Sequence, residues 1–106
     1  MDFLPNLNAA RVLLAERDPD EMDFTAAILE QAGYNVHKAY YVGDAVFALE
    51  HNRFDLALVD ALMQDRSHTR LADTMPRFSG VPWIALVDDS VSDPARLLQA
   101  GAAALV

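Results

Sequence analysis

The sequence has no cysteine, only one lysine and only four glycines among its 106 residues. Without cysteine the chain can form no disulfide, no thiolate nucleophile and no cysteine metal site. It also lacks any stretch near the roughly 18 uninterrupted apolar residues that a membrane-spanning helix requires. The first residues, MDFLPNLNAAR, contain no basic region before an apolar stretch, so they do not match a secretory signal. From these absences we expect a cytoplasmic protein with no membrane partner.

Positive charge is scarce as well. Eight arginines and lysines stand against sixteen acids, which gives a formal net charge of −8. Nucleic-acid binding depends on cationic side chains that displace counterions from phosphates, so we expect no nucleic-acid partner for this domain. An apolar fraction of 53% at this length indicates one globular domain rather than a disordered chain. We take residues 1–10 as an N-terminal extension and residues 11–106 as the domain.

Apolar runs predict the strands. Three of them are nearly continuous rather than alternating, which favours a parallel sheet covered on both faces. A fourth run mixes polar and apolar residues, as at a sheet edge, and the last residues begin a fifth strand. In chain order the predicted strands are 11–16, 34–40, 55–60, 82–88 and 102–106.

Capping signals predict a helix after the first strand. Asp18, Pro19 and Glu21 match a capping box with proline in the first helical position, and Gly33 is a terminator. The least regular part of the chain is 61–80, where a proline interrupts any helix and a serine-glycine pair marks a turn.

Two more helices are predicted with weaker boundaries. One runs from about 44 to 52 and carries Phe47, together with its apolar neighbours, toward the core. The other has Ser92 or Asp93 as its cap and ends at Gly101. Strands and helices therefore alternate, which predicts an α/β domain with right-handed crossovers.

In an open sheet of this kind, ligands bind beyond the carboxyl ends of the strands, where the strand order reverses. That edge collects Glu16 and Arg17 after the first strand, Asp60 at the end of the third, and Val87, Asp88 and Asp89 after the fourth. The turn after the first strand contains no glycine, so neither a dinucleotide fingerprint nor a P-loop is present. The three histidines, His37, His51 and His68, share no metal-like spacing, although His68 could reach this edge.

Three segments together resemble the receiver domain of two-component response regulators, a CheY-like, flavodoxin-type fold. They are VLLAERDPDEMDFTAAILEQAGYNV, GDAVFALEHNRFDLALVDALM and PWIALVDDSVSDPARLLQAGAAALV. The resemblance covers residues 11–106. It implies an open parallel sheet with strand order 2-1-3-4-5 and helices on both faces. The fifth helix of the family is expected to be absent, because the sequence stops at the fifth strand.

The resemblance also assigns the site, with Asp60 at the phosphoacceptor position. In the family, two acids after the first strand and the acceptor aspartate hold magnesium, which neutralises phosphoryl charge. Here the first acid is Glu16, and the second is replaced by Arg17. If magnesium binds at all, the resemblance implies that its ligands are Glu16, Asp60 and the backbone carbonyl of Leu62.

Other family positions are lost. The switch position, a serine or threonine in the family, is Val87, and the usually small residue after it is Asp88. The lysine position lies beyond Val106, and Gln64 stands where the loop after the acceptor usually has proline. Both Val87 and Asp88 would therefore disfavour an incoming phosphoryl group.

Three orientations of Arg17 are open. It can pair with Asp60 or Glu16 and fill the pocket, turn to solvent, or bind phosphate. At about 4 Å and an effective dielectric constant near 20, Arg17 and Asp60 would attract by roughly 4 kcal/mol before desolvation is subtracted. A fixed cation there should weaken magnesium binding, so we expect no cofactor.

The sequence thus predicts a degenerate receiver, or pseudo-receiver, which is not an enzyme and regulates partners by protein–protein contact. The expected partners are a histidine kinase, a phosphotransferase or a downstream regulator. Two alternatives stay open: a working receiver phosphorylated on Asp60, and small-molecule or nucleotide binding at the strand ends. Because no fifth helix covers one sheet face, three explanations are open: the chain is a fragment of a longer protein, a second copy covers the face, or Phe3, Leu4 and Leu7 fold back over it. In either of the first two cases we expect this 106-residue form to self-associate as a homodimer.

Overall fold

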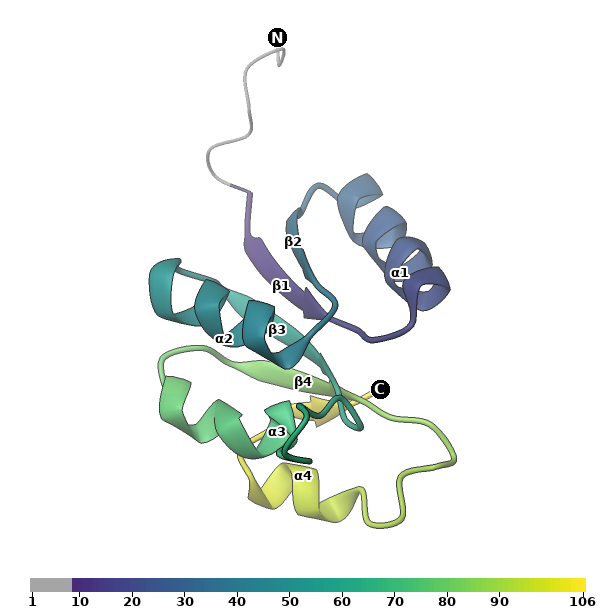
Figure 1. Cartoon of the computed structure of the whole chain (residues 1–106). Helices are drawn as coiled ribbons and strands as arrows, with labels where there is room; N and C mark the ends of the chain where they lie inside the picture. The colour runs from purple at the N-terminus through teal and green to yellow at the C-terminus, as the bar shows by residue number, and fades with distance from the viewer. Residues whose placement is uncertain (1–8) are drawn as a thin grey trace, which may run out of the picture.

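The computed structural model describes residues 9–106, which form a five-stranded parallel sheet with the order β2-β1-β3-β4-β5 (Figure 1). The strands are β1 (Arg11–Ala15), β2 (Asn35–Ala39), β3 (Leu56–Asp60), β4 (Trp83–Leu86) and β5 (Ala104–Leu105). The helices are α1 (Pro19–Gln31), α2 (Val42–His51), α3 (Leu71–Thr74) and α4 (Ala95–Gln99), with a 3₁₀ helix at Met75–Phe78. The predicted strand order and the edge position of β2 are both confirmed.

Helices cover both faces of the sheet, as predicted, because successive strand residues point to opposite sides. On one face Val12 and Leu14 of β1 pack with Met22 and Ala26 of α1. On the other face Leu13 and its alternating neighbours pack under α2, α3 and α4. Figure 1 shows α1 alone on its side of the sheet and the other three helices together on the opposite side.

The start of α1 follows the predicted cap with one change. The Asp18 carboxylate accepts the amide hydrogens of Asp20 at 2.9 Å and Glu21 at 3.4 Å. The capping box predicts that Glu21 accepts the amide hydrogen of Asp18 in return, but Glu16 Oε1 accepts it, at 3.1 Å. The helix ends before Gly33, which has φ +98°. Glu16 is thus tied to the start of α1.

Helix α2 corrects one prediction about the core. Phe47 is 63% exposed and stacks on His51 with ring centroids 4.0 Å apart. It lies two residues from both Ala45 and Leu49, which are buried, so it points to the opposite side of the helix. The helix also begins at Val42, earlier than predicted, and its N-cap Tyr41 offers no side-chain hydrogen bond.

Helix α4 corrects a second prediction. It begins at Ala95 after Pro94, and neither Ser92 nor Asp93 caps it through a side chain. Its first turn is held by the backbone instead, since the Arg96 amide donates to the Asp93 carbonyl at 3.2 Å. The predicted end is confirmed, because the last helical residue, Gln99, lies two before Gly101.

The irregular segment after β3 contains a small hairpin. Gln64 and Arg70 form an isolated antiparallel bridge, and Asp65 accepts the amide hydrogens of Ser67 at 2.8 Å and Thr69 at 2.9 Å. Helix α3 follows the hairpin and stops at Thr74, two residues before Pro76. Proline therefore limits this helix as the sequence predicts.

The face that carries α1 is only partly covered. Leu56 of β3 and Ile84 and Leu86 of β4 pack at the border of the core and remain partly exposed. The part of the chain that the structure describes contains no α-helix after β5. The predicted coverage by Phe3, Leu4 and Leu7 falls outside the described residues. No helix within 9–106 is long and apolar enough to cross a membrane.

Candidate functional site

The loops after β1, β3 and β4 meet at the carboxyl edge of the sheet around a cavity of about 780 Å³. Each strand ends at or just before a predicted site residue, so the parallel arrangement brings those residues together. The predicted residues that line the cavity are Glu16, Arg17, Asp60, Val87 and Asp88. Asp89 and Leu62, which the sequence also placed at this site, do not line the cavity.

Asp60 is the last residue of β3 and is only 6% exposed. Its Oδ1 accepts the amide hydrogen of Leu62 at 3.0 Å. Leu62 thus takes part through its amide. The other oxygen, Oδ2, is buried and has no hydrogen-bond donor among the described residues. Asp60 therefore presents one satisfied oxygen and one that is open to a cation or a donor.

Arg17 forms an ion pair with this second oxygen. Its Nε lies 2.9 Å from Asp60 Oδ2, but the direction of the N–H bond does not give a hydrogen bond. Of the three orientations considered, the side chain takes the one toward Asp60. The Arg17 side chain remains 51% exposed, so solvent screens part of the attraction.

Glu16 joins the same cluster at the end of β1. Burial raises the pKa of its carboxyl group above the ordinary value of 4.5, and the negative charge of Asp60 raises it further. The Asp18 amide and the Arg17 guanidinium act in the opposite direction and lower this pKa, without cancelling the effect of burial. The Glu16 carboxylate is therefore less favoured at this site than in a solvated glutamate.

These residues fit a magnesium ion poorly. Magnesium requires near-octahedral oxygen coordination, whereas Arg17 puts a cation beside Asp60 Oδ2 and Glu16 already accepts the Asp18 amide hydrogen. Within residues 9–106, no three histidine, cysteine, aspartate or glutamate side chains are grouped as a metal site would need. The unsatisfied oxygen of Asp60 alone supplies too few ligands.

The β4 side of the cavity is apolar and acidic. Val87 donates its amide hydrogen to the Val106 carbonyl at 2.8 Å, and its side chain carries no hydroxyl. Asp88 accepts the amide hydrogen of Ser90 at 2.7 Å, which stabilises its own turn. Lys38 lies on β2 and pairs with Asp23 at 3.3 Å, outside the lining of the cavity.

Two further points differ from the sequence-based view of the site. The first turns of α1 add Asp18, Glu21 and Thr25 to the lining. The sequence could have predicted their place in the lining, because a helix that follows β1 directly must begin at the same edge of the sheet. His68, which was considered for this site, lines a different cavity.

The chain is similar to known proteins in sequence. A family model described as the response regulator receiver domain matches residues 12–106. Protein Rrf1 of Nitratidesulfovibrio vulgaris (strain Hildenborough) is 29% identical over 82 residues, which are 74% of this chain and 59% of Rrf1. The match thus spans less than two thirds of that relative's length.

Solved structures give the same result for the fold. The response regulator receiver domain protein (CheY-like) from Methanospirillum hungatei JF-1 has a TM-score of 0.80 and 29% identity, covering 92% of this chain and 80% of that chain. The receiver domain of a sensor histidine kinase from Pseudomonas aeruginosa PAO1 has a TM-score of 0.75 and 29% identity, covering 92% and 84%. The latter structure contains a magnesium ion coordinated in its active-site cleft.

Proposed function

The chain belongs to the response regulator receiver domain family, and on that premise we propose that it is a pseudo-receiver of two-component signalling. It regulates its partners by protein–protein contact and is not switched by ordinary aspartyl phosphorylation. Its role is signalling rather than catalysis, and it needs no resident metal. A cytoplasmic location is compatible with the absence of cysteine and stays a prediction.

The ion pair between Arg17 and Asp60 carries this proposal. Phosphoryl transfer needs positive charge that neutralises the phosphoryl oxygens while the aspartate oxygen attacks. Here the 2.9 Å contact uses a fixed cation to neutralise Asp60 itself. A metal ion would have to displace this guanidinium against their mutual repulsion. The ion pair therefore opposes metal binding, which phosphoryl transfer to the aspartate requires.

The opposite wall of the cavity supports the same conclusion. Val87 cannot donate a hydrogen bond to a phosphoryl oxygen, and the Asp88 carboxylate beside it would repel one. Arrival of a phosphoryl group would therefore gain little stabilisation from β4. Without such contacts a phosphoryl group would interact almost equally with the two conformations of a switch, so it would hardly change their relative populations.

Protein contact is supported by exposed apolar side chains on α1. Phe24 is 66% exposed and Ile28 is 53% exposed, four residues apart and therefore one turn from each other. Large apolar side chains gathered on a surface commonly mark an interaction site. We propose that a kinase, a phosphotransferase or a downstream regulator contacts this side of the molecule, and that a second copy can also bind.

Phosphorylation of the 106-residue chain tests the proposal. The protein is incubated with magnesium and acetyl phosphate, and its intact mass is measured beside an Asp60→Ala control. We expect no stoichiometric phosphate on either protein. A stoichiometric phosphate that appears on the wild type and is absent from the control would overturn the pseudo-receiver assignment.

One observation favours each alternative. The buried, unsatisfied Oδ2 of Asp60 at the end of β3 is where a working phosphoacceptor would present its nucleophile. The cavity of about 780 Å³ is large enough for a small molecule at the strand ends. A crystal soaked with magnesium and a phosphoryl mimic separates the three functions: the mimic on Asp60 supports the receiver, while another ligand held in the cavity from purification supports small-molecule binding.

A further inference from the structure

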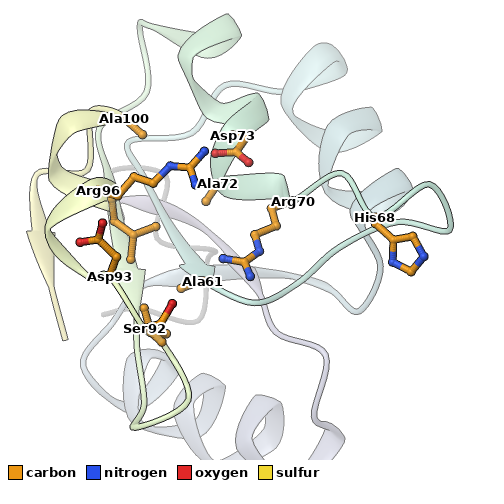
Figure 2. Close-up of a pocket in the computed structure, with 11 residues that line it drawn as sticks. Ala61, His68, Arg70, Ala72, Asp73, Ser92, Asp93, Arg96 and Ala100 are labelled. Carbon is orange, nitrogen blue, oxygen red and sulfur yellow. The ribbon is translucent and has the colours of Figure 1, made fainter.

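A second cavity, of about 210 Å³, lies between the segment after β3 and helix α4 (Figure 2). Its lining includes Ala61, Ala72 and Leu97, which are buried and belong to the core on the α2, α3 and α4 side of the sheet. Asp60 and Ala61 are consecutive, yet their side chains line different cavities. The second cavity is therefore separate from the Asp60 site and adjacent to it through the backbone.

Four charged side chains line this cavity from two elements. Arg70 is the N-cap of α3, and Asp73 lies within α3. Asp93 comes just before α4, and Arg96 lies within α4. Figure 2 shows the two arginines extending over the cavity from its two walls, with Ser92 below them. Among the described residues, neither guanidinium lies within salt-bridge distance of a carboxylate.

The backbone around both arginines is held in place before any ligand arrives. Arg70 closes the hairpin through its bridge with Gln64, and its carbonyl accepts the Asp73 amide hydrogen at 3.1 Å. The Arg96 carbonyl accepts the Ala100 amide hydrogen at 2.9 Å. A site whose backbone is fixed in advance loses less entropy when a ligand binds.

The chemistry of the walls selects the class of ligand. Guanidinium groups bind carboxylates through paired hydrogen bonds. Asp73 and Asp93 would repel a simple polyanion, but they would attract an ammonium group. The cavity is smaller than the roughly 300–1,000 Å³ of drug-sized pockets, so a nucleotide does not fit its volume. The alanine and leucine side chains offer an apolar surface for a short aliphatic group.

We propose that this cavity binds a small zwitterion, a free α-amino acid with a short aliphatic side chain. Its carboxylate contacts Arg70 and Arg96, and its ammonium group contacts Asp73 and Asp93. The bound molecule joins the hairpin and α3 to α4, so it favours the conformation in which the two walls stand at this separation. This input is independent of phosphorylation at Asp60.

A titration of the full 106-residue chain tests the assignment. L-alanine and L-valine are the probes, and binding is followed by amide chemical shifts of the hairpin and α4 and by the melting temperature. We expect saturable binding with a dissociation constant at or below about 1 mM. N-acetyl-L-alanine lacks the ammonium charge and L-alaninamide lacks the carboxylate, so each should bind at least about tenfold more weakly. Inorganic phosphate should not saturate the site.

Variants identify the residues. Arg70→Met and Arg96→Met keep the length of the side chain and should each weaken binding at least about tenfold. Arg53→Met, at an exposed arginine outside this cavity, should leave the affinity unchanged. Arg70→Lys keeps the charge without the planar fork and serves if a methionine variant fails to fold; it should also weaken binding.

The proposal is overturned if neither amino acid binds saturably. It is also overturned if phosphate or the N-acetylated probe binds as tightly as L-alanine, because the cavity would then be a simple anion site. Unchanged affinity in both folded methionine variants would remove the cavity as the binding site.

Discussion

At position 17 the arginine stands where the resemblance implies an acid, and its guanidinium faces a buried carboxylate oxygen. Arg17→Asp changes the local charge by two units and leaves Asp60 Oδ2 without its cation. We expect this variant to gain magnesium binding, seen as a rise in melting temperature with added magnesium chloride, because binding to the folded state stabilises it. The wild type should show no such rise.

The matched control for this gain is Arg17→Asp in an Asp60→Ala background. Removing the Asp60 carboxylate should abolish the magnesium effect, since the two acids after β1 alone supply too few ligands. A wild-type chain that responds to magnesium as strongly as Arg17→Asp would contradict the role given to the arginine.

Glu16 gives a prediction about pH. Its raised pKa means that the folded chain holds the proton more tightly than the unfolded chain does. Ionisation therefore costs stability, and that cost develops as the pH rises from below 4.5 through the folded pKa. Glu16→Gln should raise the free energy of unfolding at pH 7 by less than about 1 kcal/mol, since solvent reaches the group. Urea titrations of both proteins should show the difference vanish in acid, and a variant less stable at neutral pH would contradict this.

At the scale of elements, α1 depends on its cap. Asp18→Ala removes the acceptor of the Asp20 and Glu21 amide hydrogens and should lower the free energy of unfolding by about 0.5–2 kcal/mol. Asp18→Asn retains an acceptor and should stay within a few tenths of a kcal/mol of the wild type. Urea denaturation measures both variants, and an equal loss in both would mean that charge rather than capping matters.

Two glycines that look alike in sequence should respond oppositely to alanine. Gly33 has φ +98°, so Gly33→Ala forces a left-handed conformation and should cost about 1–2 kcal/mol. Gly43 lies in the first turn of α2 with nothing within 4 Å of the added Cβ, so Gly43→Ala should stabilise by up to about 0.5 kcal/mol. Thermal denaturation of both variants measures these changes in stability. A change in the same direction for both variants would contradict the difference in backbone conformation between the two glycines.

The elements differ in how well the sequence predicts them, and the reason is local chemistry. Helix α1 has an Asp-Pro start and a glycine end, so both boundaries were predictable. Helix α2 begins after Tyr41, which gives no capping signal, and Phe47 faces outward although it belongs to an apolar run. The tight turn closed by Asp65 was missed because it depends on side-chain-to-backbone hydrogen bonds within a short loop.

At the scale of the whole molecule, the site was predictable in position more than in detail. Parallel strands put Glu16, Asp60 and Val87 at one edge whatever their side chains do. The direction of Arg17 was left open, because a long, flexible side chain can reach either Asp60 or solvent. The cavity between Arg70 and Arg96 had no sequence signal, since it depends on how the segment after β3 packs beside α4.

The partly covered sheet face leads to a prediction of self-association. Leu56, Ile84 and Leu86 remain partly exposed on the side of α1, and Ile28 is 53% exposed. Ile28 comes three residues after Thr25, which lines the Asp60 cavity, so it stands on the side of α1 toward β3 and β4. Stable dimers bury about 1,200–2,000 Å² in total, and an apolar face beside a helix can supply part of such an interface.

We expect the 106-residue chain to form dimers at tens of micromolar, as measured by sedimentation equilibrium. Ile28→Lys places a charge beside the apolar face and should weaken the dimer at least about tenfold. Phe47→Lys is the matched control, because Phe47 is a large exposed residue on α2, across the sheet from α1. It should leave the dimer unchanged. A wild-type chain that sediments as a clean monomer at these concentrations, or equal weakening in both variants, would show that this face does not drive association.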